Sequence, residues 1–361
     1  MDQRGIWTEP FQGTYGAMAA LRLPGMARIL SGGSRPPIHY LTGLRPTETG
    51  LGTSTFVMPA TGWLQLGVGT YSGGAMAWVA DAPLTSAIAT GLAPGWIATT
   101  SELSMNFLRA PGVSSGSFTG RARTIHANRR VGLSAIEVTD ALGRLVAHGT
   151  TRAIIVEVPG VVDGDLEESA LVGKTGPGTG PAPFEREAVG FVAPPQYWDA
   201  MTGLESIEEG IDGKDVLPPV HHLTGLRPIE ASESHTVWTL PNTEWLCSPA
   251  PYLYGGAIAW FADHALIGAY TVTMERGHVA APLDLKVQFL RPVFPNTGNL
   301  LARGEVVHRG RSIVVARSEV TDHDGRTIAL ATGSAMVVRG GVRRLLEDDP
   351  ETLAADAEAG A

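Results

Sequence analysis

The chain has 361 residues, of which 43% are hydrophobic and 17% charged, so it can bury a sizeable core and is not disordered as a whole. Its net charge of -9 argues against a nucleic-acid surface, which needs clustered lysine and arginine. The single cysteine, Cys247, excludes an internal disulfide and a cysteine metal cluster. With neither a secretory signal nor a membrane span in the sequence, we expect a cytoplasmic protein without a metal and without a role at membranes.

The chain carries one unit twice. PPIHYLTGLRP at 36–46 returns as PPVHHLTGLRP at 218–228, GGAMAWVADAPL at 73–84 as GGAIAWFADHAL at 255–266, and EVTDALGR at 137–144 as EVTDHDGR at 319–326. Every pair is offset by the same 182 positions, so the repeat cores are 36–155 and 218–337. We predict an N-terminal domain over 1–160, a Gly/Pro-rich linker over 161–190, a C-terminal domain over 191–340 and an acidic tail over 341–361.

The first copy reads, in chain order, as one helix among several strands. We predict a strand over about 54–64 interrupted by Pro59, a helix over 73–90, and β-rich runs over 98–109, 116–126, 131–140 and 144–156. The second copy repeats this order 182 residues later. One helix followed by antiparallel strands is an α+β pattern.

Each predicted helix is apolar on nearly every face, yet it contains one acid, Asp81 in the first copy and Asp263 in the second. A carboxylate in a buried helix is costly unless it is paired or faces a cavity. Two interpretations stay open: a buried aspartate satisfied by hydrogen bonds, or a general base that orients water in a cleft.

A pair of glycines opens each helix, Gly73-Gly74 and Gly255-Gly256. Unpaired amides at a helix N-terminus could polarise a carbonyl, although the glycines could instead serve a tight turn. Gly74 and Asp81 are seven residues apart, about 10 Å along a helix, so one helix cannot present both groups to one carbonyl. We therefore predict two antiparallel helices, with the glycines of each facing the aspartate of the other in two composite sites.

This constellation resembles a known family. Gly-Gly, an Asp seven residues after the second Gly, a β run ending in Phe-Leu-Arg, then His-x-x-Arg and Asp-x-x-Gly-Arg are similar to the hotdog-fold acyl-CoA thioesterases, in particular the phenylacetate-pathway (PaaI-like) branch, here in tandem form. The resemblance implies two hotdog domains, each a long central helix wrapped by an antiparallel sheet, paired as a pseudo-dimer with the active sites between them. It also implies an acyl-CoA substrate, a role in lipid metabolism, and assembly as a dimer or trimer of double hotdogs.

The family's roles fall unequally on the two copies. Where the family has His before the glycines, this chain has Ser72 and Tyr254, and where it has a catalytic hydroxyl the chain has Thr100 and Pro282. The well-equipped composite site then comprises Asp81, Thr100, Gly255, Gly256, Tyr254 and Ser248. The poorer one comprises Asp263, Pro282, Gly73, Gly74, Ser72 and Leu66. Pro83, two residues after Asp81, is expected to kink the first helix.

The resemblance also suggests how the substrate is held and cleaved. The loops with Arg129, Arg130, Arg309 and Arg311 would reach the coenzyme A phosphates, although they could equally be exposed hairpin charges. Coenzyme A would enter as part of the substrate, and no cofactor is expected. Asp81 would deprotonate water or attack the thioester itself through an anhydride. Two other functions stay open: a non-catalytic acyl-CoA-binding or regulatory protein, and a hotdog hydratase or dehydratase. The latter would need a matched acid–histidine pair, whereas His264 directly follows Asp263, so the two point about 100° apart on a helix, and Ala82 replaces it in the first copy.

Overall fold

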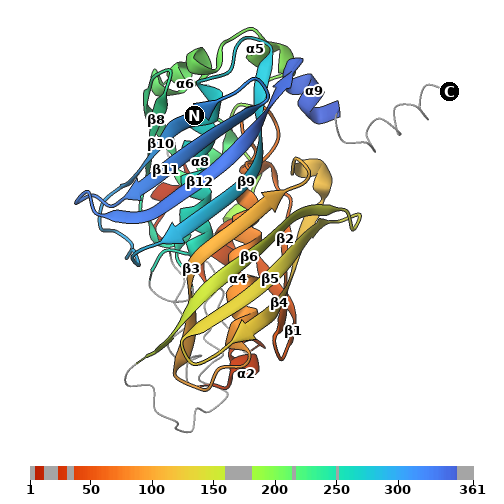
Figure 1. Ribbon diagram of the computed structural model, residues 1–361, viewed down its shortest axis with the longest axis vertical. Helices are drawn as coiled ribbons and strands as arrows, with labels where there is room; N and C mark the ends of the chain where they lie inside the picture. The colour runs from red at the N-terminus through yellow and green to blue at the C-terminus, as the bar shows by residue number, and fades with distance from the viewer. Residues whose placement is uncertain are drawn as a thin grey trace, which may run out of the picture.

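One antiparallel sheet runs along the molecule, with two long helices packed behind it (Figure 1). The computed structural model describes residues 5–11, 23–30, 36–158, 181–213, 217–248 and 252–347. Most of the predicted linker and the tail beyond residue 347 lie outside these residues. None of the helices in the described segments is long and apolar enough to cross a membrane.

The first copy folds close to its predicted elements. It comprises α3 (Pro37–Thr42), β1 (Arg45–Gly50), β2 (Thr53–Pro59), α4 (Ala75–Ala89), β3 (Trp96–Phe107), β4 (Ser117–Ala127), β5 (Val131–Asp140) and β6 (Leu145–Glu157). The predicted strand over 54–64 ends at Pro59, and a short 3-10 turn, Gly62–Leu64, follows it. Strand β1 was not predicted.

The second copy repeats this order. It comprises α7 (Pro219–Thr224), β7 (Arg227–Ala231), β8 (His235–Leu240), α8 (Gly255–Thr271), β9 (His278–Phe289), β10 (Leu300–Arg309), β11 (Ile313–Thr321) and β12 (Thr327–Arg339). Short helices outside the repeat cores are α2 (Gly25–Leu30), α5 (Pro195–Asp199), α6 (Gly203–Ile211) and α9 (Gly341–Glu347).

The two copies share the sheet, whose twelve strands run in the order β1-β2-β4-β5-β6-β3-β9-β12-β11-β10-β8-β7. The central junction is the antiparallel pair β3–β9, with Ser104 opposite Lys286 at the middle of its register. Six strands on one side of this junction come from the first copy and six on the other side from the second.

Helices α4 and α8 fill the space enclosed by the sheet because they are apolar all round. The indole rings of Trp78 and Trp260 are both fully buried and meet with centroids 4.9 Å apart, so each helix contributes an anchor to the contact. Pro83 lies inside α4, which nevertheless continues to Ala89.

Contacts between the copies are reciprocal outside the helices as well. The amide of Ile38 donates to the carbonyl oxygen of Cys247 at 3.2 Å, and the amide of Val220 donates to that of Gln65 at 3.3 Å. The two donors are 182 residues apart, and so are the two acceptors, which is the repeat offset. Such reciprocal contacts are the pattern of a two-fold interface, here within one chain.

Candidate active site

Each buried aspartate meets the first turn of the opposite helix. The amide of Gly256 donates to Asp81 Oδ2 at 3.0 Å, and the amide of Gly74 donates to Asp263 Oδ2 at 2.7 Å. Because the start of each helix lies beside the middle of the other, α4 and α8 run antiparallel. The structure thus brings together glycines and carboxylates that a single helix would hold about 10 Å apart.

The second glycine of each pair donates to the carboxylate, which leaves the first glycine for another acceptor. At the start of α8, Gly255 is partly exposed, and no acceptor in the described part of the chain bonds to its amide. A Cβ atom at this position would lie 2.8 Å from Asp81 Oδ2. Only glycine therefore fits without displacing the carboxylate.

The equivalent glycine in the other site is covered. Gly73 is buried, and a Cβ atom on it would lie 2.7 Å from Cδ2 and 2.8 Å from Cζ of the Phe107 ring. Gly255 is therefore the more accessible of the two glycines, whereas Gly73 lies beneath an aromatic side chain. Sequence comparison of the two copies gave no sign of this difference, because Phe107 has its own counterpart in Phe289.

Both oxygens of the Asp81 carboxylate are hydrogen-bonded, although the side chain is buried. Thr100 Oγ1 donates to Oδ1 at 2.5 Å, and the Gly256 amide donates to Oδ2. Burial raises the pKa of Asp81 to about 6, and the bonds from Thr100 and Gly256 oppose that rise. The group is therefore ionised at neutral pH and remains basic enough to accept a proton.

Asp263 lacks the second of these bonds. Its Oδ2 accepts from Gly74, but its buried Oδ1 has no partner among the described residues, and Pro282 stands where Thr100 stands in the first copy. Burial raises the pKa of Asp263 to about 7, opposed only by the bond from the Gly74 amide. Asp263 thus accepts one hydrogen bond where Asp81 accepts two.

A tyrosine that the sequence analysis missed lies beside Asp81. The Thr99 side chain hydrogen-bonds the Tyr252 hydroxyl, whose pKa is raised by burial and by the nearby negative charge of Asp81. The corresponding positions of the other site hold Thr70 and Ala281. The two copies differ at this position, with Tyr252 in one and Thr70 in the other, but position 252 lies outside the motifs that defined the repeat.

Tyr254 is buried at the N-cap of α8, and its hydroxyl reaches the backbone of α4. It donates to the carbonyl oxygen of Trp78 at 2.9 Å and accepts from the amide of Ala82 at 2.7 Å. We predicted substrate contact for this residue, and the structure shows that its hydroxyl bonds to protein groups on both sides.

The two serines predicted to contact substrate are both buried. The amide of Ser248 donates to the carbonyl oxygen of Tyr252 at 3.0 Å. Ser72 Oγ accepts from the amide of Ala75 at 3.2 Å and so satisfies the start of its own helix. Leu66, the counterpart of Ser248, packs against the core.

The arginines predicted to hold phosphates lie at the hairpin ends and are exposed. Arg129 and Arg130 lie in the β4–β5 turn, while Arg309 ends β10 and Arg311 follows it. Arg309 forms an ion pair of 3.0 Å with Glu275. Among the described residues, none of these side chains bonds to Asp81 or Asp263.

His264 does not pair with its neighbour Asp263. Its Nδ1 faces the carbonyl oxygen of Trp260 at 3.1 Å, and its ring packs on the indoles of Trp260 and Trp238. Burial lowers the pKa of His264 to about 4, so the ring is neutral at pH 7. No group of three or more potential metal ligands occurs within the described residues.

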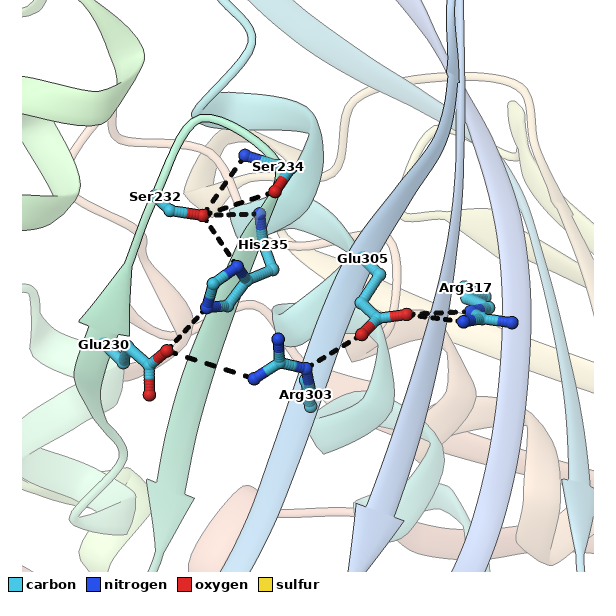
Figure 2. A network of polar contacts seen from close by, with 7 residues as sticks. All are labelled: Glu230, Ser232, Ser234, His235, Arg303, Glu305 and Arg317. Carbon is cyan, nitrogen blue, oxygen red and sulfur yellow. Dashed lines mark hydrogen bonds and ion pairs between the residues drawn. The ribbon is translucent and has the colours of Figure 1, made fainter.

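A second polar cluster joins residues of the neighbouring strands β7, β8, β10 and β11 (Figure 2). Glu230 contacts His235 at 2.6 Å and Arg303 at 4.0 Å, and Glu305 pairs with Arg303 at 2.9 Å and Arg317 at 2.7 Å. These charges neutralise one another across neighbouring strands at a largely exposed surface, where ion pairs contribute little energy. In the first copy, Arg123 and Ala135 replace Glu305 and Arg317, and a depression of about 480 Å³ lies at these positions.

A long buried helix wrapped by an antiparallel sheet, with carboxylates where two such units meet, defines the hotdog class of fold. Residues 250–329 match the family model of the thioesterase superfamily, and residues 55–155 match that of the acyl-CoA thioesterase C-terminal domain. A Deinococcus radiodurans protein that bears the name of an esterase is 30% identical over 118 residues, covering 32% of this chain and 72% of the relative. The chain belongs to the thioesterase superfamily.

Solved structures agree on the fold. The tesB protein of Mycobacterium avium subspecies paratuberculosis superposes with a TM-score of 0.52 at 12% identity, covering 84% of this chain and 98% of its own. Acyl-CoA thioesterase II TesB2 of Mycobacterium marinum gives 0.50 at 14% identity with the same coverage of both chains. A hot dog protein of Alicyclobacillus acidocaldarius gives 0.51 at 16% identity, covering 84% and 99%. The expected hotdog fold is confirmed.

Proposed function

We propose that this protein hydrolyses an acyl-CoA thioester at the composite site of Asp81 and the start of α8. The observation that carries the proposal is a buried carboxylate fixed by Thr100 and Gly256, beside a Gly255 amide with no acceptor in the described part of the chain. A carboxylate of pKa about 6 next to a polarising amide is suited to base-catalysed acyl transfer to water.

The reaction follows from these positions. The thioester carbonyl oxygen accepts from the Gly255 amide, where the positive end of the α8 dipole stabilises the charge of the tetrahedral intermediate. Asp81 takes a proton from water as the water oxygen bonds to the carbonyl carbon. The intermediate then breaks its carbon–sulfur bond, and Asp81 returns the proton to the departing thiolate. No metal or cofactor takes part.

The alternative chemistry is attack by Asp81 itself to form an anhydride, which water then opens. A single turnover in oxygen-18 water separates the two routes. Direct hydrolysis places the label in the carboxylic acid product, whereas the anhydride route can leave it in the Asp81 side chain. We favour direct hydrolysis because both Asp81 oxygens already accept bonds that fix the carboxylate.

The remaining predictions fit this proposal. We infer a tandem hotdog pseudo-dimer of the PaaI-like branch, with domains at 1–160 and 191–340 and a linker over 161–190, supported by the reciprocal contacts of the two copies. Arg129 and Arg311 would bind the phosphates of coenzyme A. We place the protein in the cytoplasm, in lipid metabolism, as a dimer or trimer of double hotdogs.

The second composite site is altered in this proposal. Asp263 has no hydroxyl partner, and Phe107 covers Gly73, the counterpart of Gly255, so this site would bind or hydrolyse substrate poorly. The same features would occur at both sites in a non-catalytic acyl-CoA-binding protein. The intact Asp81–Thr100 bond favours catalysis over that alternative.

Steady-state hydrolysis of a panel of acyl-CoAs tests the proposal, with Asp81→Asn and Asp263→Asn compared on the best substrate. Loss of a positioned base costs about 10²- to 10⁴-fold, so Asp81→Asn should abolish most activity while Asp263→Asn keeps a large share. Circular dichroism controls for folding. If Asp81→Asn were active and Asp263→Asn inactive, the catalytic site would be that of Asp263. If both variants were active, neither carboxylate would be the catalytic base.

A further inference from the structure

A proline lies inside α4, two residues after the aspartate that carries the carboxylate. Pro83 has no amide hydrogen to offer the carbonyl oxygen of Val79, and a proline ring inside a helix crowds the preceding turn. Asp81 lies on that turn. The backbone that aims the proposed base is thus weakened by its own sequence.

The Tyr254 hydroxyl bonds to the weakened turn on both sides. It donates to the carbonyl oxygen of Trp78 and accepts from the amide of Ala82. These groups are four residues apart, and an uninterrupted α-helix pairs them with each other. Asp81 lies between them in sequence, so this bridge spans the residue that carries the carboxylate.

The same tyrosine belongs to the other half of the site. Tyr254 is the N-cap residue of α8 and directly precedes Gly255 and Gly256, whose backbone lies against Asp81. Tyr254 is 4% exposed, so these two hydrogen bonds lie inside the core. One residue therefore links the turn that carries the base to the amides that face it.

The second composite site has no such bridge in the described part of the chain. Ser72 takes the place of Tyr254, and its hydroxyl bonds within the start of its own helix. In α8, His264 takes the place of Ala82 and bonds the carbonyl oxygen of Trp260 through its own side chain. Ala265 takes the place of Pro83, so that helix has no proline to compensate.

We propose that Tyr254 is a positioning residue. The two bonds of its hydroxyl, which we call the splint, hold the turn before Pro83 so that Asp81 keeps its bonds to Thr100 and Gly256. This inference rests on the proposed function, and it gives Tyr254 the role of positioning Asp81 rather than of contacting the substrate. The splint matters only while Pro83 is present.

Tyr254→Phe removes the hydroxyl and leaves the ring. Since a misplaced catalytic group costs orders of magnitude, kcat should fall by about tenfold or more while KM stays within about twofold. The acid limb of kcat/KM should move to higher pH, because looser bonds from Thr100 and Gly256 lower the pKa of Asp81 less. Pro83→Ala restores the helix amide. In that background, Tyr254→Phe should lower kcat by about threefold or less.

Tyr71→Phe is the matched control. Tyr71 is equally buried, and its hydroxyl donates to the carbonyl oxygen of Thr61 at 2.7 Å, so its loss reports the general effect of removing a buried tyrosine hydroxyl. This variant should lower the melting temperature without moving the pH profile. Unchanged kcat in Tyr254→Phe, or an equal loss in both backgrounds, would overturn the splint.

Amide exchange of Ala82 separates this inference from the proposed function. Exchange should accelerate in Tyr254→Phe and return toward the wild-type rate in the double variant with Pro83→Ala, whether or not the protein hydrolyses thioesters. An unchanged exchange rate refutes the splint alone, whereas a wild-type protein without thioesterase activity refutes the proposed function alone. If Tyr254→Phe fails to fold, the double variant should still fold, and its failure to do so would also refute the splint.

Discussion

Asp263→Asn should make the protein more stable at alkaline pH, by an amount that grows with pH. Asp263 is 1% exposed, and its Oδ1 lacks a partner in the described structure, so ionising it inside the fold is costly. Asparagine is nearly isosteric, keeps an oxygen for the Gly74 amide and cannot ionise. The substitution therefore removes the cost of a buried charge while preserving the helix contact.

The magnitude follows from the pKa. Burial raises the pKa of Asp263 from 3.8 to about 7, so the folded state holds a proton that the unfolded chain has released. The stability that this group provides is complete below pH 3.8 and is lost as the pH rises through about 7, on the order of 4 kcal/mol in total. Between about pH 5 and pH 8, the variant should gain roughly 3 kcal/mol relative to wild type.

Urea denaturation of both proteins at pH 5 and pH 8 measures this gain, because the difference in free energy of unfolding at each pH isolates Asp263. His264 titrates with the opposite sign: its pKa is lowered to about 4, so its contribution falls as the pH drops from 6.5 toward 4. That contribution is present in both proteins and cancels in the difference. A difference that stays constant between the two pH values would show that Asp263 is not buried as a neutral acid.

Other perturbations test the proposed active site. Thr100→Val removes a bond that lowers the pKa of Asp81, so the acid limb of kcat/KM should move upward from about pH 6, while Thr100→Ser should leave it in place; an unmoved limb in the valine variant would contradict Asp81 as the titrating base. Arg129→Ala and Arg311→Ala should raise KM for an acyl-CoA more than they lower kcat, and wild-type KM in both would exclude these loops from nucleotide binding. Gly255→Ala should lower kcat by about tenfold or more, since the new Cβ would lie 2.8 Å from Asp81 Oδ2, and full activity would mean that this amide does not polarise the carbonyl.

The antiparallel arrangement of the two helices, and the pairing of each aspartate with the opposite glycines, could be predicted from the spacing of residues within and between the two copies. Gly74 and Asp81 are seven positions apart, which is too long a span for one active site, and a second copy 182 residues later supplies the missing partner. The offset also predicted which site would lack a hydroxyl, since Pro282 replaces Thr100.

The contacts that the sequence did not predict all join segments far apart in the chain. Tyr252 approaches Asp81 across 171 positions, and the Phe107 ring covers Gly73 although both copies carry the same residue types there. Residue type and spacing determine neither approach, because each depends on how the strands and loops pack around the helices. Tyr254 was identified as part of the site, but its bond to a helix interrupted by Pro83 required the folded backbone.

The reciprocal bonds between α4 and α8 also determine how the protein can change. In an assembly of two identical chains, any substitution appears in both sites at once, so a harmful change in one site cannot be spared in the other. Here each position occurs once, and each site draws its carboxylate from one copy and its amides from the other. Under the proposed function, the second copy could lose the reactivity of Asp263 and still be indispensable, because the amides that face Asp81 belong to it.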